Sequence, residues 1–442
     1  RLTRPRPRHP SPAARNRLHT MPTNPLRVCI TSSSSFPTPG GVEMRINRYL
    51  KGFTERGVHV EVIAGTPTLG KLTEHDTDSE WRSLPIGHIF PPEMVDNVPI
   101  HRIRLGDNMD KERIVFFGEK IIELLDSGLI VPHVVHSLST KPNFTIPLLK
   151  ALKARGKGLV FTYAIAHKAP IWPPQKLVKG LVKRYFLKHA YNHFDVIIVA
   201  THALKTMLRS LGVSTEIAII PNGVNIERYR PPQTPDEKLE ARRDLGLPLD
   251  CQLVCGVGTV YPRKGCDLLL EAWHKLADKY PNLHVVWLGR RRDLFVPELA
   301  AYGRKMETLL NRGDAPARIH MLGHSDKVPT YLKASDIFAF PSEREGMPNA
   351  VLEAMATGLP TVMTYYRGYS EEMGRKDHDY VLTDRDSDSL ANAIDLLLSS
   401  ESMRAEVGKN ALDFIRRTMP LSQSIDRHVD VYRSVARTKG LM

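Results

Sequence analysis

The chain has 442 residues, of which 42% are apolar and 25% are charged, and its net charge is +14. This length is too great for one ordinary core and predicts two globular domains of about 200 residues each. No apolar run reaches the roughly 18 residues that a membrane-spanning helix needs, so no such helix is expected.

The positive charge is concentrated near the beginning of the sequence. Six arginines lie in the first seventeen residues, which contain no acidic residue, and without these six charges the excess falls from +14 to +8. That excess is modest for this length, so no nucleic-acid partner is predicted. Residues 1–21 are rich in Arg and Pro and lack the apolar region of a secretory signal, so we expect a disordered tail.

The four cysteines show no CxxC pair and no disulfide-framework or zinc spacing. We expect reduced thiols in a cytoplasmic protein.

The first half of the chain alternates short apolar runs with segments of helical periodicity. Leu26–Thr31 predicts a strand, a loop rich in Ser, Pro and Gly follows it, and a helical pattern then ends at Gly57. Further strands are predicted over residues 58–63, 133–136, 159–163, 195–200 and 216–220. Residues 66–108 lack a clear period and are expected to form loops and irregular strands. The alternation predicts a parallel sheet that binds a ligand at the carboxyl ends of its strands.

Two glycines, Gly40 and Gly41, follow the first predicted strand. The backbone at a helix N-terminus can approach a phosphate closely there, although two loop glycines can equally form an ordinary turn.

The second half begins after a charged, Pro-containing linker at residues 231–250. Strands are predicted over residues 252–257, 283–288, 318–322 and 336–340, and a helix over 266–279. Between the first of these strands and the helix, Arg263 and Lys264 form an adjacent pair of cations. This position suits the neutralisation of a pyrophosphate, although a solvated basic turn would have the same sequence.

The most informative stretch runs from Pro341 to Pro360. It contains two carboxylates, Glu345 and Glu353, separated by seven residues. Pro348 suits the first helical position and Gly358 the end, so the pattern predicts a helix over Asn349–Thr357. Its unpaired backbone N–H groups would form an anion site between the two carboxylates.

Two groups of acidic residues also have simpler interpretations. A capping box from Ser342 to Glu345 would place Pro348 inside a helix, which proline breaks, so we disfavour it. Asp384, Asp386 and Asp388 imitate a metal-binding DxD pattern, but they precede a periodic helix and are better explained as capping residues. No metal site is predicted.

The stretch from Pro341 to Pro360 resembles the Glu-x7-Glu signature of retaining GT-B glycosyltransferases of family 4, in its Glu-Gly-Met-Pro-Asn variant. Gly40-Gly41-Val42-Glu43, Pro221-Asn222-Gly223 and Arg263-Lys264-Gly265 also match family elements, so the resemblance covers nearly the whole chain from Leu26. It implies an α/β fold of two Rossmann-like domains facing across a cleft. The implied parts are an acceptor domain at 22–215, a nucleotide-sugar domain at 216–420, and a C-terminal helix at 421–442 packing on the first domain.

The resemblance also implies roles for individual residues. Glu345 would hold hydroxyls of the donor sugar, Glu353 would bind the ribose, and Arg263 and Lys264 would hold the departing phosphate. The remaining implied donor-binding residues are Gly40, Gly41, Leu322, Gly346, Met347, Asn349 and Ala350. One departure is Thr259, where many members of the family have arginine, and Arg263 is the expected substitute.

The acceptor side matches the family less well. Members often have a histidine where this chain has Ala164. His167, three residues later, and His136 are candidates for the same catalytic space, although a lone loop histidine is more often a surface residue.

The resemblance predicts a metal-independent, retaining hexosyltransferase that uses a UDP- or GDP-linked sugar and no cofactor. The acceptor would be a small molecule, a glycan or a lipid-linked sugar. A GT-B sugar-nucleotide epimerase and a non-catalytic nucleotide-sugar-binding protein are the alternatives.

A predicted helix near residues 175–189 carries Lys176, Lys179 and Lys183 on one side. Such a face is usually solvated, but it could also contact anionic lipid at the inner face of a membrane.

Overall fold

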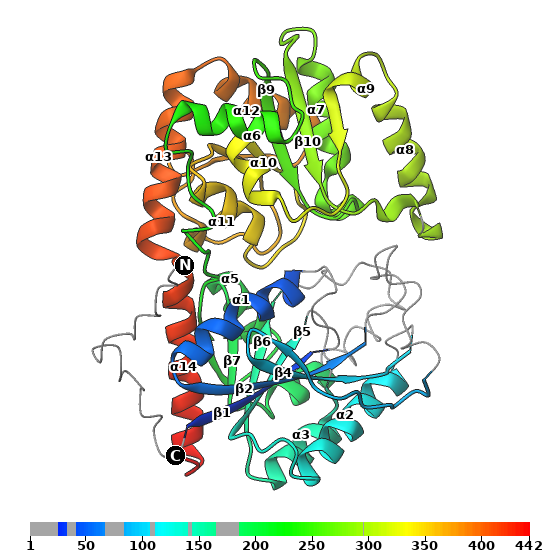
Figure 1. Cartoon of the computed structure of the whole chain (residues 1–442), viewed down its shortest axis with the longest axis vertical. Helices are drawn as coiled ribbons and strands as arrows, with labels where there is room; N and C mark the ends of the chain where they lie inside the picture. The colour runs from blue at the N-terminus through cyan, green and yellow to red at the C-terminus, as the bar shows by residue number, and fades with distance from the viewer. Residues whose placement is uncertain are drawn as a thin grey trace, which may run out of the picture.

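The computed structural model describes residues 25–32, 41–66, 84–106, 111–139, 144–164, 185–294 and 296–442. These residues form two α/β domains, each built on a sheet of mainly parallel strands, with one domain above the other in Figure 1. The predicted fold class is therefore confirmed. Within these ranges, no helix combines the length and apolar character of a membrane span.

The first domain contains an eight-stranded sheet with the order β3-β4-β2-β1-β5-β6-β7-β8. All neighbouring strands pair in parallel except β3 and β4, which are antiparallel. β1, β5, β6 and β7 are almost entirely buried, as expected for strands covered on both faces. The strands are β1 Leu26–Ser32, β2 Val58–Gly65, β3 Glu93–Val95, β4 Val98–Ile103, β5 Val134–Ser139, β6 Gly158–Tyr163, β7 Val196–Val199 and β8 Glu216–Ile219.

Helices cover this sheet on both faces. They are α1 Gly41–Glu55, α2 Lys111–Asp126, α3 Ile146–Ala154, α5 His202–Ser210 and, from the far end of the sequence, α14 Leu421–Thr438. In Figure 1, α1 lies on the side of the first domain that faces the second. This places a first-domain helix next to the ligand-binding edge of the second sheet.

The second domain contains a six-stranded parallel sheet with the order β11-β10-β9-β12-β13-β14. The strand order reverses between β9 and β12, and such switch points are where open α/β sheets bind ligands. The strands are β9 Gln252–Val257, β10 Leu283–Leu288, β11 Ile319–Met321, β12 Ile337–Phe340, β13 Thr361–Thr364 and β14 Val381–Thr383.

The helices of the second domain surround this sheet. They are α6 Pro235–Asp244, α7 Cys266–Leu276, α8 Ala300–Leu310, α9 Ala315–Arg318, α10 Val328–Ala334, α11 Asn349–Ala356, α12 Ser387–Leu398 and α13 Glu401–Thr418. Short 3-10 turns are η5 Pro262–Lys264, η6 Arg292–Leu294, η7 Pro297–Leu299 and η8 Glu371–Met373.

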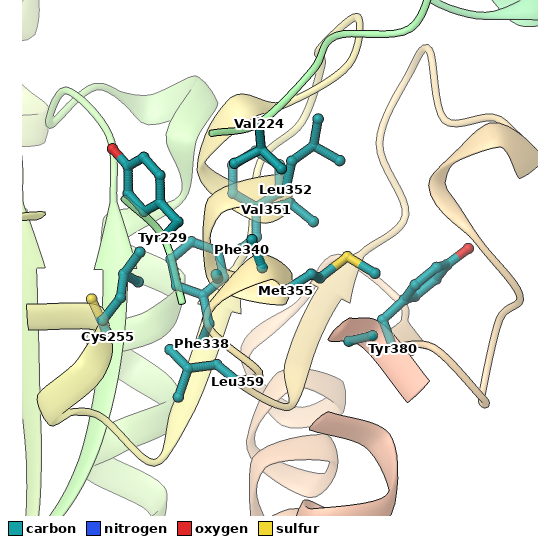
Figure 2. Close-up of a cluster of buried hydrophobic side chains, with 14 of the residues drawn as sticks. Val224, Tyr229, Cys255, Phe338, Phe340, Val351, Leu352, Met355, Leu359 and Tyr380 are labelled. Atoms are coloured by element: carbon teal, nitrogen blue, oxygen red, sulfur yellow. The ribbon is translucent and has the colours of Figure 1, made fainter. Parts of the chain in front are cut away.

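The helix α11 is anchored by its apolar face. Val351, Leu352 and Met355 are fully buried in one cluster with Phe338 and Phe340 of β12 (Figure 2). Burying each such side chain stabilises the fold by about 1.5–3 kcal/mol. The helix that carries Glu353 is therefore fixed on the sheet, and its N-terminus has a defined direction.

The chain crosses between the domains twice, and the two crossings are hydrogen-bonded to each other. The Val224 N–H donates to the Met419 carbonyl at 2.9 Å, and the Leu421 N–H donates to the Val224 carbonyl at 3.0 Å. After the second crossing, α14 contacts α1, β1, β5 and β6 and contributes Ile425, Val429 and Tyr432 to the core of the first domain.

Every predicted strand forms, but two other expectations were wrong. The boundary expected between residues 215 and 216 is too early, because β8 pairs with β7 and completes the first sheet. Residues 66–108 include β4, a regular inner strand between β2 and β3. Its sequence obscures the apolar pattern because His101 and Arg102 are buried in it, paired with Glu61 and Glu93.

All four cysteines are buried and free of disulfides, as their spacing predicts.

Candidate active site

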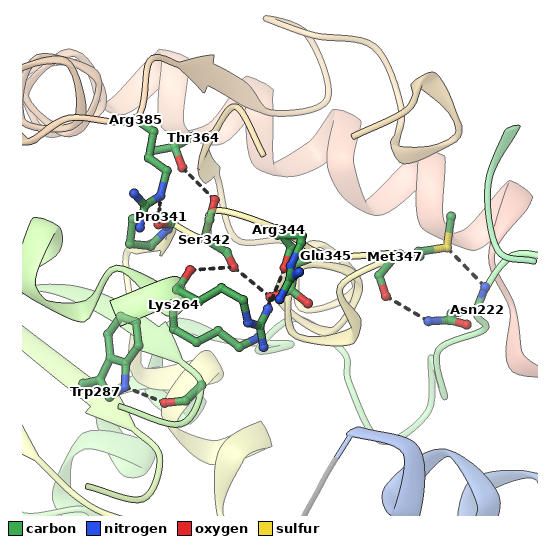
Figure 3. A network of polar contacts seen from close by, with 12 residues as sticks. Asn222, Lys264, Trp287, Pro341, Ser342, Arg344, Glu345, Met347, Thr364 and Arg385 are labelled. Carbon is green, nitrogen blue, oxygen red and sulfur yellow. Dashed lines mark hydrogen bonds and ion pairs between the residues drawn. The ribbon is translucent and has the colours of Figure 1, made fainter. Parts of the chain in front are cut away.

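The loop before α11 holds Glu345 in a nearly buried position. Its side-chain Oε1 accepts hydrogen bonds from Arg263 Nη1 at 2.6 Å, Lys264 Nζ at 2.7 Å and Ser342 Oγ at 2.7 Å (Figure 3). Burial opposes ionisation, but the charges of Lys264 and Arg263 outweigh it and lower the pKa of Glu345 below its ordinary value. Glu345 is therefore a carboxylate at neutral pH, held by two cations.

The turn between β9 and α7 presents those cations. η5 contains both Arg263 and Lys264 and ends at Gly265, whose φ is +70°. A Cβ at Gly265 would lie 2.2 Å from the Pro341 carbonyl oxygen, so only glycine allows this turn to approach the loop after β12. The Glu343 N–H donates to the Arg263 carbonyl at 2.8 Å and closes the two loops together.

Glu353, one turn inside α11, is also buried. It forms an ion pair with Arg48 of α1, so the contact joins the two domains. Tyr229 lies beside this pair, and burial together with the negative charge of Glu353 raises the pKa of Tyr229 to about 12. The tyrosine hydroxyl therefore stays protonated and can act as a hydrogen-bond donor.

A pocket of about 300 Å³ opens at the carboxyl ends of β9 and β10. Gly258 and Gly289 line it, and a Cβ at Gly289 would lie 1.9 Å from the Gly258 carbonyl oxygen. The lining residues are Arg48, Arg228, Tyr229, Val257, Gly258, Thr259, Leu288, Gly289, Arg290, Arg292, Gly323, His324, Ser325, Asp326, Val328 and Glu353. The pocket has the size for a nucleoside and is rich in arginine, which suits an anionic ligand.

Among the predicted residues that the structure describes, only Glu353 lines this pocket. The Lys264 side chain lies beside the pocket, because a Cβ added to Gly258 would be 3.3 Å from Lys264 Cδ. Leu322 is half exposed, and its N–H donates to the Trp287 carbonyl at 3.0 Å. The next two residues, Gly323 and His324, line the pocket. The segment that contains Leu322 therefore reaches the pocket, and its role in binding the donor stays a prediction.

The predicted sugar-binding loop leads into the helix as expected, with one correction. Gly346 and Met347 are buried, and Asn349 and Ala350 open α11. Pro348 is not the first helical residue. It precedes the helix as the N-cap, with φ −77° and ψ 112°, because its backbone is extended where the loop enters.

The end of β6 reaches this loop from the first domain. A Cβ on Gly346 would lie 2.3 Å from the carbonyl oxygen of Ala164, so the two backbones are in close contact. Residue 164, where members of the family that the sequence resembles often have a histidine, therefore lies next to the Glu345 loop.

The histidine candidates have different outcomes. His136 is fully buried, bonded to Tyr432 at 2.6 Å and to Thr162 at 2.8 Å, so it stabilises the core and its candidacy as a catalytic residue was wrong. His167, Gly40 and the lysines at 176, 179 and 183 lie outside the described residues. Gly41 is described only as the first residue of α1.

Within the described part of the chain, no three His, Cys, Asp or Glu side chains are grouped so that they could hold a metal ion. Asp386 instead caps α12 by accepting from the Ser389 N–H at 2.8 Å, and Asp388 pairs with Lys275. The capping interpretation of this DxD pattern is confirmed.

Several pocket residues were not predicted. Arg290 and Arg292 follow β10 in the run Gly289-Arg290-Arg291-Arg292, which repeats the pattern of cations after β9 and could have been found from it. Arg48 gave no such signal, because its contact with Glu353 depends on how the domains face each other.

The chain resembles known proteins throughout. Residues 39–228 match the family model described as Glycosyltransferase Family 4, and residues 237–414 match the one described as Glycosyl transferases group 1. The putative teichuronic acid biosynthesis glycosyltransferase TuaC of Bacillus subtilis is 26% identical over 59% of this chain and 61% of its own length. Four relatives of comparable similarity, TuaC among them, are matched over only 54–66% of their own lengths.

Longer but weaker similarities also exist. The phosphatidyl-myo-inositol mannosyltransferase of Mycolicibacterium smegmatis is 22% identical over 89% of this chain and 90% of its own length. The crystal structure of Anabaena Alr3699/HepE in complex with UDP-glucose has a TM-score of 0.67 and 18% identity, and the match covers 92% of this chain and all of that one.

Proposed function

Because the chain belongs to glycosyltransferase family 4 and has the GT-B fold, we propose that it moves a hexosyl unit from a UDP- or GDP-linked sugar to an acceptor hydroxyl with retention of configuration. The observation that carries this proposal is the buried Glu345 carboxylate held by Arg263 and Lys264 before the N-terminus of α11. The carboxylate of Glu345 would bind the sugar, and the adjacent cations Arg263 and Lys264 would bind the phosphates. A sugar linked to a diphosphate needs these two kinds of contact side by side.

The nucleoside of the donor would occupy the pocket at β9 and β10, with Glu353 on the ribose. Glu353 already forms an ion pair with Arg48. The Arg48 guanidinium must therefore share this carboxylate with the ribose or move away from it when the donor binds. The diphosphate would then point toward Lys264, Arg263 and the N-terminus of α11, whose dipole favours negative charge.

In the proposed reaction the bond between the anomeric carbon and the phosphate oxygen breaks, and its electron pair leaves with the nucleoside diphosphate. The acceptor oxygen bonds to the anomeric carbon on the same face, and its proton passes to the departing phosphate. Arg263 and Lys264 stabilise the charge that develops on the leaving group. This chemistry needs no base from the protein, so the alanine at position 164 is compatible with it.

Incubation with a panel of UDP- and GDP-sugars tests the proposal against its alternatives. A transferase releases nucleoside diphosphate in amounts that depend on an added acceptor or cell extract, together with a glycosylated product of retained configuration. An epimerase converts the donor without an acceptor, and a binding protein leaves every donor intact. Either of the last two results would contradict the proposal. UDP-glucose is the first donor to test, because it is the ligand bound to Anabaena HepE.

We further propose that transfer needs no metal, since Arg263 and Lys264 supply the positive charge at the phosphates. Excess EDTA should leave the transfer rate unchanged, measured as product formed per minute after extensive dialysis. Loss of activity in EDTA that manganese or magnesium restores would contradict this assignment.

We also propose a lipid-linked acceptor, because the predicted helix near residues 175–189 would carry three lysines on one side and the name of one relative, the phosphatidyl-myo-inositol mannosyltransferase, contains a phospholipid. Each lysine near an anionic surface contributes about 1 kcal/mol. The protein should then sediment with anionic vesicles at low salt, remain free with neutral vesicles, and lose binding when Lys176, Lys179 and Lys183 are changed to Glu.

The matched control for this vesicle experiment changes Lys51, Lys150 and Lys153 to Glu, three exposed positions elsewhere on the first domain. That variant has the same net charge and should still sediment. Absence of binding at every salt concentration would indicate a soluble acceptor.

A further inference from the structure

We propose that Asn222, in the first crossing between the domains, is a positioning residue that orients Asn349 toward the nucleotide sugar. This inference rests on the proposed function, because it assigns the donor loop as the part that Asn222 controls. Asn222 lies outside the pocket and is 8% exposed, so it acts through other residues.

Asn222 uses all of its donors on one loop. Its Nδ2 donates to the Met347 carbonyl at 2.9 Å and to Asn349 Oδ1 at 3.0 Å, and its backbone N–H points to Met347 Sδ at 3.2 Å. Figure 3 shows Asn222 directed at Met347 from the neighbouring chain segment. An amide nitrogen has two hydrogens, and both are taken by this loop.

These bonds determine which way the Asn349 amide faces. Since Asn349 Oδ1 accepts from Asn222, the Nδ2 end of Asn349 must face away from Asn222. That nitrogen has no hydrogen-bond partner among the described residues and belongs to the first residue of α11. The first N–H groups of a helix also lack partners within it. Asn349 therefore adds two side-chain donors to the unpaired backbone donors at the proposed phosphate and sugar site.

The residues on either side of Asn222 are held by α14 and α1. Ser424 Oγ donates to the Pro221 carbonyl at 2.8 Å, and Tyr49 of α1 bonds the same hydroxyl at 2.9 Å. A Cβ on Gly223 would lie 2.5 Å from Leu421 Cα, so the two crossings are in backbone contact. The backbone that carries Asn222 is thus fixed by both crossings, so its side chain starts from a defined position beside Met347 and Asn349.

Asn222→Asp is the informative variant, because it keeps the shape of the side chain and removes both donors. The carboxylate would repel Asn349 Oδ1 and the Met347 carbonyl, so the Asn349 amide would turn its oxygen toward the donor. We expect affinity for UDP or GDP, measured by calorimetry, and kcat/KM for the nucleotide sugar each to fall by about tenfold, equivalent to about 1.4 kcal/mol. Asn225→Ala is the control, since Asn225 lies in the same crossing and bonds only its own turn.

A double-mutant cycle separates positioning from a merely structural role. If Asn222 acts through Asn349, then Asn222→Ala should cost about tenfold in the wild type and much less in the Asn349→Ala background. The inference would be overturned if the fold-losses of the two single variants simply multiply in the double variant. It would also be overturned if Asn222→Ala lowers the melting temperature but leaves the affinity and kcat/KM unchanged. In both cases, transfer by the wild type would still support the proposed function. Failure of the wild type to bind UDP, GDP or any of their sugars would overturn both.

Discussion

Replacing Glu345 with glutamine should lower turnover by on the order of a hundredfold or more. The carboxylate is the common acceptor of Arg263, Lys264 and Ser342, and it carries a full negative charge because its pKa is lowered. Glutamine keeps the size but removes the charge that would stabilise the positive anomeric carbon of the donor. The loss should appear in kcat, measured with saturating nucleotide sugar.

The matched control for Glu345 is Glu343→Gln, two residues earlier in the same loop. Glu343 is exposed, and its hydrogen bonds to Arg263 and Arg367 are made by its backbone. It should retain near wild-type turnover. Both variants should unfold at temperatures close to that of the wild type, and a Glu345→Gln protein with normal turnover would remove Glu345 from the site.

Replacing Lys264 with alanine should weaken the binding of the nucleoside diphosphate product by about tenfold or more, because a cation beside the leaving group is lost. Calorimetry with UDP and GDP measures this directly. The loss should shrink as ionic strength rises, since the interaction is electrostatic. An unchanged dissociation constant would show that Lys264 serves only to hold Glu345.

The control for Lys264 is Lys275→Ala, near the C-terminus of α7. Lys275 pairs with Asp388 on the surface, so its removal changes the net charge equally and leaves the pocket intact. Its dissociation constants should match those of the wild type.

The sequence predicted four of the six strands of the second sheet, β9, β10, β11 and β12, because each contains a mainly apolar run. β9 and β10 begin and end where the apolar pattern does, and their side chains are buried on both faces. β4 was missed because its buried residues include His101 and Arg102, whose side chains pair with Glu61 and Glu93 from other strands. A polar residue looks exposed in a sequence, and only the fold shows its partner.

The parts of the site that lie close together in the sequence were predictable, and the contacts between distant positions were not. Glu345 and Glu353 stand in one short motif, and the loop with Arg263 and Lys264 has a recognisable strand-to-helix position. The contacts of Arg48 with Glu353 and of Asn222 with Asn349 instead join residues that are 305 and 127 positions apart. Such pairs depend on the arrangement of the two domains, which no local pattern encodes.

The packing of α14 has a consequence for synthesis on the ribosome. Domains usually fold in the order in which they are translated. Here Ile425, Val429 and Tyr432, which close the core of the first domain, are translated after every strand and helix of the second domain. The second domain can therefore complete its own core while the first still exposes an apolar groove against α1 and β1. The nascent chain should consequently gain protease resistance in its second domain first, and in its first domain only when α14 has emerged.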